Sequence, residues 1–502
     1  MGRSQPGQTR KASIIGGFGA FALCLLAVRA IAAPPVADPI LFWNDQTNRA
    51  IQEASMDPFV ATRALALESL AVFDTMRSIA GLPGFLVRLP APLGTSAEVA
   101  TTAAAHAMLL YLFPTRRTDL NAAFARALAA YAPGADRARS VRFGEDVAAA
   151  IVAIRNRDGW NANGPVTVAP EPGKWRPTPP YFLPPLDTQW ALLTPFTLNA
   201  PNQFRPSGPP PLDSPAFNRA RAQTAAIGGK LSKQRTPDQS RAAHYWSDAI
   251  GTYAPAGHWN SIAATAITAK KLPPMEEATL FARLNVAIAD SAIAMADAKY
   301  TFWLWRPITT IQAGDASFPA QPGWTPFLST PPHPSYVSGH SVFSGAAAEV
   351  LTAILGNRPF KAGSASLPGV VRSFPNFHYA AEEAANSRLW GGIHYKFDND
   401  DGLVIGRSVG AWAMAAFDRM NDERGPVIVL DGAGTGGFVF DNKAPVTAIE
   451  ATLDGGPDAS IPVDSAGRFS LPQCGAGQHD LRLKAVGAGG RVATVTATLT
   501  GG

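Results

Sequence analysis

The sequence contains KYTFWLWRP at residues 299–307, HPSYVSGH at 333–340 and SRLWGGIH at 387–394. These three stretches indicate both the fold and the chemistry of the chain. Each of them combines cationic or histidine side chains with proline or glycine residues that interrupt helices. Pro307 disfavours a helical backbone at the residue before it, so Arg306 is expected at the end of a helix. Such chain breaks typically present side chains to a site.

Lys299, Arg306 and Arg388 are three cations that these stretches could bring together. The spacing of seven residues between Lys299 and Arg306 equals two helical turns and predicts that both point to one side. Burying three cations in one place costs free energy unless a multiply charged anion joins them. The set therefore predicts an oxyanion site, although Lys299 and Arg306 taken singly also suit ordinary surface charges.

Ser338, Gly339 and His340 lie just before a helical pattern at 341–355. A helix N-terminus offers free N–H groups and a positive dipole to an anion, and glycine lets the backbone come close. Taken alone, Ser338 would be an ordinary helix N-cap. Two glycines end the helix before His394 and allow this histidine to turn inward, although a lone histidine is more often packed or exposed than a ligand.

Composition indicates a large folded chain. It has 502 residues, of which 46% are hydrophobic and 16% charged, and this length suggests about three domains. Residues 1–32 carry four basic and no acidic side chains, so removing them changes the net charge from +5 to +1. This balance gives no support for a nucleic-acid partner. We find no later run of about 18 uncharged apolar residues and expect no membrane span in the mature chain.

The first 32 residues have the order of a secretory signal peptide. Basic residues precede an apolar stretch at 12–28, and Ala30-Ile31-Ala32 forms a small-residue cleavage site. We expect cleavage after Ala32 and a secreted or periplasmic protein; an uncleaved N-terminal anchor is the alternative. Cleavage would leave Cys474 as the only cysteine, so the mature chain could form no intramolecular disulfide.

The remaining sequence divides into a helical part and a β-rich part. Residues 33–425 carry mostly helical periodicity, interrupted by a Pro-rich segment at 160–215 that we expect to wrap over helices. Residues 426–502 instead alternate short β-rich runs with Gly, Asp and Asn, which is typical of a β-sandwich, here predicted to be immunoglobulin-like. The predicted fold is mainly α, with this small all-β domain at the end.

Together the three stretches resemble the signature of the vanadium-dependent haloperoxidases and their relatives, the type 2 phosphatidic acid phosphatases and bacterial acid phosphatases. That signature is K-x6-R-P, P-S-G-H and S-R-x5-H. The first and third segments match at every defined position, whereas Val337 replaces the proline of the second. The resemblance, which is strongest to bacterial bromoperoxidases, covers about residues 36–422 and implies a helical-bundle fold.

The resemblance also implies a cofactor and roles for named residues. The cofactor would be vanadate, with His394 as its only protein ligand to vanadium and His340 as the acid–base group. The other vanadate-binding (or phosphate-binding) residues would be Lys299, Arg306, Ser338, Gly339 and Arg388. Asp248 would support the site by pairing with Arg388. The substrates would be hydrogen peroxide, a halide and a small organic acceptor.

His333 suggests which halide is used. Bromoperoxidases of the family tend to carry histidine at this position and fungal chloroperoxidases phenylalanine. An imidazole here adds a titratable hydrogen-bonding partner that would reduce the electrophilicity of activated peroxide. The resemblance therefore implies oxidation of bromide and iodide in preference to chloride, unless His333 only caps a Pro-rich turn.

Two other functions fit the same residues. In a soluble secreted acid phosphatase, His394 would attack phosphorus to form a phosphohistidine and His340 would protonate the leaving group. In a non-catalytic oxyanion-binding or adhesive protein, the β-rich part would be the working region. The acid–base histidine argues against pure binding, which needs only cations. The sequence does not determine the oligomeric state.

Overall fold

The computed structural model describes residues 36–87, 89–164, 171–419, 426–430, 435–440, 446–464, 468–487 and 490–501. The predicted signal peptide at 1–32 and the expected domain boundary at 425 lie outside them. The described part from residue 36 onward is mainly helical, with small antiparallel sheets, as expected.

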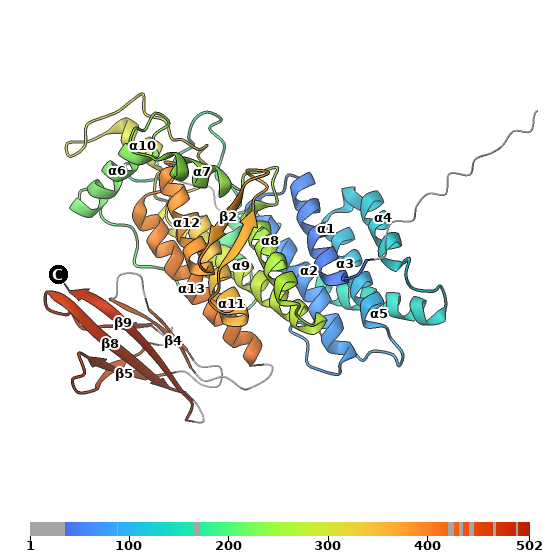
Figure 1. Ribbon diagram of the computed structural model, residues 1–502. Helices are drawn as coiled ribbons and strands as arrows, with labels where there is room; N and C mark the ends of the chain where they lie inside the picture. The colour runs from blue at the N-terminus through green and yellow to red at the C-terminus, as the bar shows by residue number, and fades with distance from the viewer. Residues whose placement is uncertain are drawn as a thin grey trace, which may run out of the picture. The chain divides into compact units, whose positions relative to one another are not determined.

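The N-terminal helices form a layer of their own, coloured blue to cyan in Figure 1. They are α1 (Pro39–Glu53), α2 (Pro58–Ile79), α3 (Ala97–Leu112), α4 (Arg117–Leu128) and α5 (Ala135–Arg155), with a short 3-10 helix, η1 (Pro114–Arg116), before α4. Their first turns are fixed by side-chain caps, such as Asp57 before α2 and Ser96 before α3.

The second set of helices supplies the predicted site. They are α6 (Pro215–Gly228), α7 (Pro237–Tyr245), α8 (Ala254–Lys270), α9 (Pro274–Phe302), α10 (Pro307–Ala313), α11 (Gly339–Leu355), α12 (Phe377–Trp390) and α13 (Lys396–Asp418). A hairpin of β1 (Phe360–Gly363) and β2 (Val371–Phe374) lies between α11 and α12 in the chain. All of these helices except α10 were predicted from helical periodicity, at residues 216–234, 238–250, 256–270, 275–305, 340–356, 377–390 and 401–421. The hairpin, whose strands are only four residues long, was not predicted.

Helix α9 is the centre of the helical part, because it packs against α2, α11 and α13. It is long and apolar enough to cross a membrane by length and composition, but 94% of its most apolar window is buried inside the protein. Burial against neighbouring helices accounts for that apolar character, so α9 is a core helix.

Glycines let α11 and α13 approach closely. A Cβ on Gly406 of α13 would lie 2.2 Å from the carbonyl oxygen of Val342 in α11, and one on Gly345 would lie 2.7 Å from the carbonyl oxygen of Leu403. Both distances are too short for any side chain, so these positions need glycine. The close contact fixes the start of α11, at 338–340, relative to α13.

The Pro-rich segment places several aromatic side chains in the core and is hydrogen-bonded to helix α9. Apart from residues 165–170, which are outside the described part, its one helical turn is η2 (Thr188–Leu192). Trp175, Trp190 and Phe204 are buried. The carboxylate of Asp290 in α9 accepts hydrogen bonds from the backbone N–H groups of Phe196 and Thr197, both at 2.7 Å, and thereby fastens the segment to the core helix.

The C-terminal part contains two antiparallel sheets, with strand orders β3-β4-β7 and β6-β5-β8-β9. The strands are β3 (Val427–Leu430), β4 (Gly436–Phe440), β5 (Ala448–Leu453), β6 (Ala459–Pro462), β7 (Arg468–Ser470), β8 (Gly477–Val486) and β9 (Val492–Gly501). Leu481, Leu483 and Ala485 alternate into a hydrophobic cluster that includes residues of both sheets. The β-rich runs of the sequence, at residues 427–430, 446–453, 469–471, 480–486 and 492–499, do not include β4 or β6. The immunoglobulin-like type stays a prediction.

We expect Asp290→Ala to destabilise the protein by about 2–4 kcal/mol. The substitution leaves the N–H groups of Phe196, Thr197 and Leu198 without their carboxylate acceptor, and a buried polar group without a partner costs about 1–3 kcal/mol. Urea unfolding monitored by tryptophan fluorescence measures the change. Asp213→Ala, which removes an exposed carboxylate from the same Pro-rich segment, is the matched control and should change stability little. Equal stability of the two variants would contradict the role of Asp290.

Candidate active site

Lys299 and Arg306 come from two different elements. Lys299 lies in the last turn of α9, which ends at Phe302; Trp303 then adopts a left-handed backbone conformation with φ of 53°. Arg306 is the N-cap residue of α10. The expectation that one helix carries both cations is therefore wrong, because the chain turns between them. Both side chains are nevertheless fully buried, so neither is a surface charge.

These two cations contact carbonyl groups rather than carboxylates. Lys299 Nζ donates to the carbonyl oxygens of Pro334 at 2.7 Å and Ser335 at 3.1 Å. Burial and the charge of Arg306 hold the pKa of Lys299 well below its usual range. Burial also lowers the pKa of Arg306 to about 10. An anion bound nearby would relieve this electrostatic cost.

The Arg306 guanidinium joins two histidines. Its Nη1 lies 3.0 Å from His394 Nε2, and its Nη2 lies 2.9 Å from His333 Nδ1. A guanidinium only donates hydrogen bonds, so both ring nitrogens accept and carry a lone pair. Burial and the charges of Arg306 and Lys299 lower the pKa of His394 well below its usual range, and the same causes act on His333. Both imidazoles are therefore neutral.

Asp398 fixes the orientation of His394. Its Oδ2 lies 2.9 Å from His394 Nδ1 and also accepts hydrogen bonds from the hydroxyl of Ser335 and the N–H of Tyr395. With the proton of His394 on Nδ1, Nε2 has the lone pair that a metal ligand needs. The site predictions did not include Asp398, although its position four residues after His394, within the segment that resembles the family, was a usable signal.

The start of α11 presents groups without partners. Ser338 occupies the N-cap position, but its hydroxyl caps nothing, and within the described part of the chain its Oγ has no hydrogen-bond partner. A Cβ on Gly339 would lie 2.7 Å from the sulfur of Met295, so a larger residue here would have to displace that side chain. The neighbouring Val337 is buried, and the Tyr336–Val337 peptide bond is cis.

His340 lies beside the same helix start, and its Nε2 also lacks a hydrogen-bond partner among the described residues. Burial and the charge of Arg388 lower the pKa of His340 to about 3, although the charge of Asp248 acts in the opposite direction. His340 is thus neutral over the ordinary pH range and can accept a proton through Nε2.

Arg388 lies in the last turn of α12. Its Nε donates to Ser387 Oγ at 3.0 Å and its Nη2 to the carbonyl oxygen of Ala243 at 3.2 Å. Burial lowers the pKa of Arg388 to about 10. The chain then turns at Gly392, where φ is 75° and a Cβ would lie 2.2 Å from the carbonyl oxygen of Gly228, so the expected glycine turn toward His394 is present.

Asp248 has other partners than the expected one. Its carboxylate lies 3.1 Å from Nδ1 of His258 and 3.9 Å from Nε2 of His340. No hydrogen bond or ion pair joins it to Arg388 in the described structure, although the charge of Arg388 helps to lower the pKa of Asp248. The expected direct pair is therefore replaced by a pair with His258, which the sequence analysis did not select.

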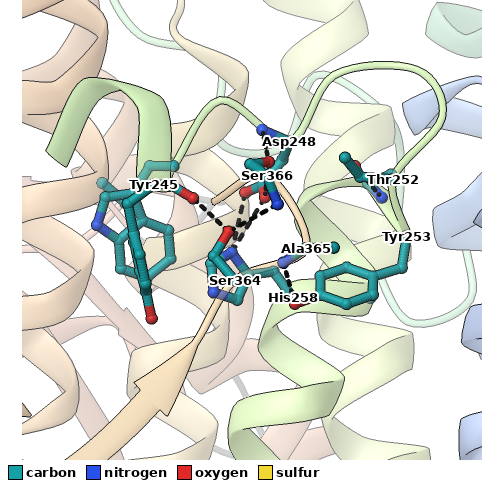
Figure 2. Close-up of polar contacts among 12 residues, drawn as sticks. Tyr245, Asp248, Thr252, Tyr253, His258, Ser364, Ala365 and Ser366 are labelled. Carbon is teal, nitrogen blue, oxygen red and sulfur yellow. Dashed lines mark hydrogen bonds and ion pairs between the residues drawn. The ribbon is translucent and has the colours of Figure 1, made fainter. Parts of the chain in front are cut away.

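A polar network holds Asp248 in place (Figure 2). Its backbone has φ of 43°, in the left-handed region that asparagine and aspartate tolerate better than most residues. The N–H of Asp248 donates to Ser366 Oγ at 2.8 Å, and the hydroxyl of Ser366 lies 3.2 Å from Asp248 Oδ1. The loop between β1 and β2, which the sequence did not predict, thus supports the carboxylate.

This arrangement suits a tetrahedral oxyanion better than a metal cation. Three buried cations, one unpaired serine hydroxyl and a helix N-terminus are available, with one neutral histidine lone pair. Within the described ranges no group of three or more His, Cys, Asp or Glu side chains could chelate a metal ion. Vanadate, which needs cations and one nitrogen ligand, fits this donor set.

Comparisons with known proteins find similarity to vanadium haloperoxidases, the family that the three stretches resemble. Residues 279–423, which contain all three signature stretches, match the family model described as the VCPO second helical-bundle domain. Vanadium chloroperoxidase from Curvularia inaequalis is 29% identical over 413 residues, which are 64% of this chain and 67% of the relative.

Two solved structures of vanadium-dependent haloperoxidases are also similar to this chain. The first bacterial vanadium-dependent iodoperoxidase is 28% identical, with a TM-score of 0.68 over 76% of this chain and 97% of its own. A bacterial vanadium-dependent chloroperoxidase in its holo form is 17% identical, with a TM-score of 0.59 over 74% of this chain and 93% of its own, and shows similarity of fold alone.

We expect Ser338→Ala to weaken orthovanadate binding about tenfold. It removes the unpaired hydroxyl, and a hydrogen bond to a charged group contributes about 1.5–3 kcal/mol. Isothermal titration calorimetry measures the affinity. The control is Ser96→Ala: Ser96 is also an N-cap residue, but its hydroxyl accepts a hydrogen bond from Val99 N and caps its own helix. An unchanged affinity in Ser338→Ala would remove Ser338 from the anion site.

Proposed function

We propose, from the similarity of this chain to the vanadium-dependent haloperoxidases, that it uses hydrogen peroxide to oxidise iodide and bromide to hypohalous-acid equivalents, which then halogenate a small organic acceptor. One observation carries the proposal. Lys299, Arg306 and Arg388 are buried and donate no hydrogen bond to a carboxylate in the described part of the chain. Their charges act on the neutral His394, whose Nε2 carries a lone pair.

The residues that would hold vanadate each have a separate task. His394 would supply the one nitrogen ligand, oriented by Asp398 through Nδ1. Ser338 Oγ and the N–H of Gly339 would donate hydrogen bonds to the oxyanion, and the three cations would balance its charge. Bound vanadate would supply a Lewis-acid centre at which peroxide becomes able to oxidise a halide.

His340 would move the protons. Its Nε2 has no hydrogen-bond partner within the described part of the chain, and its lowered pKa keeps it neutral. It would accept a proton from hydrogen peroxide as the peroxide enters the site and would later return it to the product side. A base of this kind contributes about 10²–10⁴-fold to a rate.

The position of His333 supports the preference for iodide and bromide. His333 shares the Arg306 guanidinium with His394 and packs edge-on against Phe59 at 6.0 Å between ring centroids. Because Nδ1 accepts from Arg306, the proton of the neutral ring lies on Nε2, where it can donate to peroxide oxygens and reduce their electrophilicity. The iodoperoxidase relative at 28% identity agrees with this preference, whereas the chloroperoxidase relatives leave chloride open.

The proposed place of action is the periplasm or the exterior of a bacterium. The order of basic, apolar and small residues in the first 32 residues supports this. Peptide mapping of the exported protein should find a new N-terminus at Ala33.

We expect peroxide-dependent bromination of monochlorodimedone to require vanadate and to be inhibited competitively by phosphate, because phosphate has the same shape as vanadate and a similar charge.

His394→Ala should lose bound vanadium, whereas His340→Ala should keep bound vanadium and lose about 10²–10⁴-fold in turnover. Vanadium is measured by inductively coupled plasma mass spectrometry after gel filtration.

The control is His244→Ala, in which an exposed histidine of α7 is removed; it should retain both vanadium and turnover. Full activity in vanadate-free protein would overturn the proposed function. Hydrolysis of p-nitrophenyl phosphate without any halide oxidation would instead favour the acid phosphatase, and anion binding without either reaction the non-catalytic protein.

We expect His333→Phe to raise the ratio of chloride to bromide turnover by about tenfold, because it removes the ring donor that moderates the peroxide. Steady-state rates with each halide at several pH values measure the ratio. A wild-type enzyme that turns over chloride and bromide equally, with no change in His333→Phe, would show that His333 does not set the halide preference.

A further inference from the structure

His258 is a buried histidine that the mechanism above does not use. It lies in the first turns of α8, and neither its side chain nor that of its partner Asp248 is more than 1% exposed. Its Nδ1 faces both carboxylate oxygens of Asp248, at 3.1 and 3.2 Å. Its Nε2 faces the carbonyl oxygen of Gly363 at 3.1 Å (Figure 2).

Both ring nitrogens of His258 therefore face oxygens that can only accept hydrogen bonds. A neutral imidazole has one N–H and would leave one of these oxygens unpaired in a buried place, whereas an imidazolium donates to both. The Asp248 carboxylate balances its charge. Trp246 stacks on the ring with 4.6 Å between centroids, and an aromatic face stabilises a cation.

Asp248 stands between this histidine and His340. The same carboxylate that pairs with His258 lies 3.9 Å from His340 Nε2, which is too long for a hydrogen bond but close enough for a strong charge effect. An Asp248 charge without a partner would favour the protonated form of His340, which cannot take a proton from peroxide.

We propose that His258 is a positioning residue that stays doubly protonated and neutralises Asp248, so that His340 remains a neutral base in the haloperoxidase reaction. The inference rests on the proposed function for the role of His340. The Asp248–His258 pair would then set the pH below which activity is lost. The charge of His258 indeed acts to lower the pKa of His340.

The groups that face His340 come from several elements. Arg388 of α12 and His258 of α8 lower its pKa, and Asp248 in the α7–α8 loop raises it. His333 is also near His340, and the charge of His340 lowers the pKa of His333. Replacing His258 by a neutral residue removes one cation and frees one anion, so both effects raise the pKa of His340. Activity that needs neutral His340 is lost when the pH is lowered. In the His258 variant this loss should begin at a higher pH than in the wild type.

The first test is nuclear magnetic resonance of vanadate-free protein with ¹⁵N-labelled histidine. It does not depend on activity, so it separates failure of this inference from failure of the proposed function. We expect both His258 nitrogens to show the shifts of protonated nitrogens at pH 7. In His258→Gln the titration midpoint of His340 should rise by about one pH unit. A neutral His258 with a single N–H, or an unchanged midpoint for His340, would overturn the proposal.

His479 provides a matched control, because it has the same kind of partners in the β-rich part. Its Nδ1 lies 2.8 Å from Asp454 Oδ2 and its Nε2 3.0 Å from the carbonyl oxygen of Gly475, but on the surface. His479→Gln should leave the titration of His340 unchanged. His258→Phe is the second variant and should move the midpoint in the same direction as His258→Gln.

The vanadate-loaded enzyme gives the second test. The acid limb of kcat/KM for bromide should move up by about one pH unit in His258→Gln. In an Asp248→Asn background there is no carboxylate charge to neutralise, so adding His258→Gln should move the limb much less. A merely structural role would lower kcat/KM at all pH values without moving the limb, and that result would contradict the proposal.

Discussion

Three buried cations that donate no hydrogen bond to any carboxylate of the described residues are the main constraint on this structure. Lys299, Arg306 and Arg388 are at most 2% exposed, and their hydrogen bonds go to carbonyl oxygens, a serine hydroxyl and two imidazole nitrogens. Burial lowers the pKa of all three. A bound oxyanion would offset this electrostatic cost, because its negative charge would interact with all three cations.

Backbone geometry makes that arrangement possible. Gly339 at the start of α11 and Gly392 after α12 occupy positions where a Cβ would collide with Met295 or with the backbone of Gly228. The close packing of α11 on α13 brings Ser338 to Asp398, whose carbonyl oxygen accepts the Ser338 N–H at 2.9 Å. The same aspartate orients His394 through its carboxylate. The glycines at these close contacts thus determine how near Ser338, Asp398 and His394 lie to one another.

The site has two histidine–aspartate pairs with opposite electrical character. In the first, Asp398 binds Nδ1 of a histidine whose other nitrogen accepts from Arg306, so that histidine is neutral and can be a ligand. In the second, Asp248 binds Nδ1 of His258, whose other nitrogen faces a carbonyl oxygen. A histidine–aspartate pair can therefore either orient a neutral histidine ligand or form a buried ion pair. The group that faces the other ring nitrogen, a donor for His394 and an acceptor for His258, makes the difference.

The sequence was sufficient to predict the helical class, the short strands near the C-terminus and the residues that carry the resemblance. These follow from local rules: hydrophobic periodicity, the backbone limits of proline and glycine, and the spacing within the three stretches. Only the tertiary structure decided that Lys299 and Arg306 lie on different helices, that Asp398 supports His394, and that Asp248 pairs with His258. The physical reason is that these contacts depend on how distant segments pack. The β1–β2 loop at 364–370, which contacts Asp248 across more than a hundred residues of chain, leaves no periodic signal in the sequence.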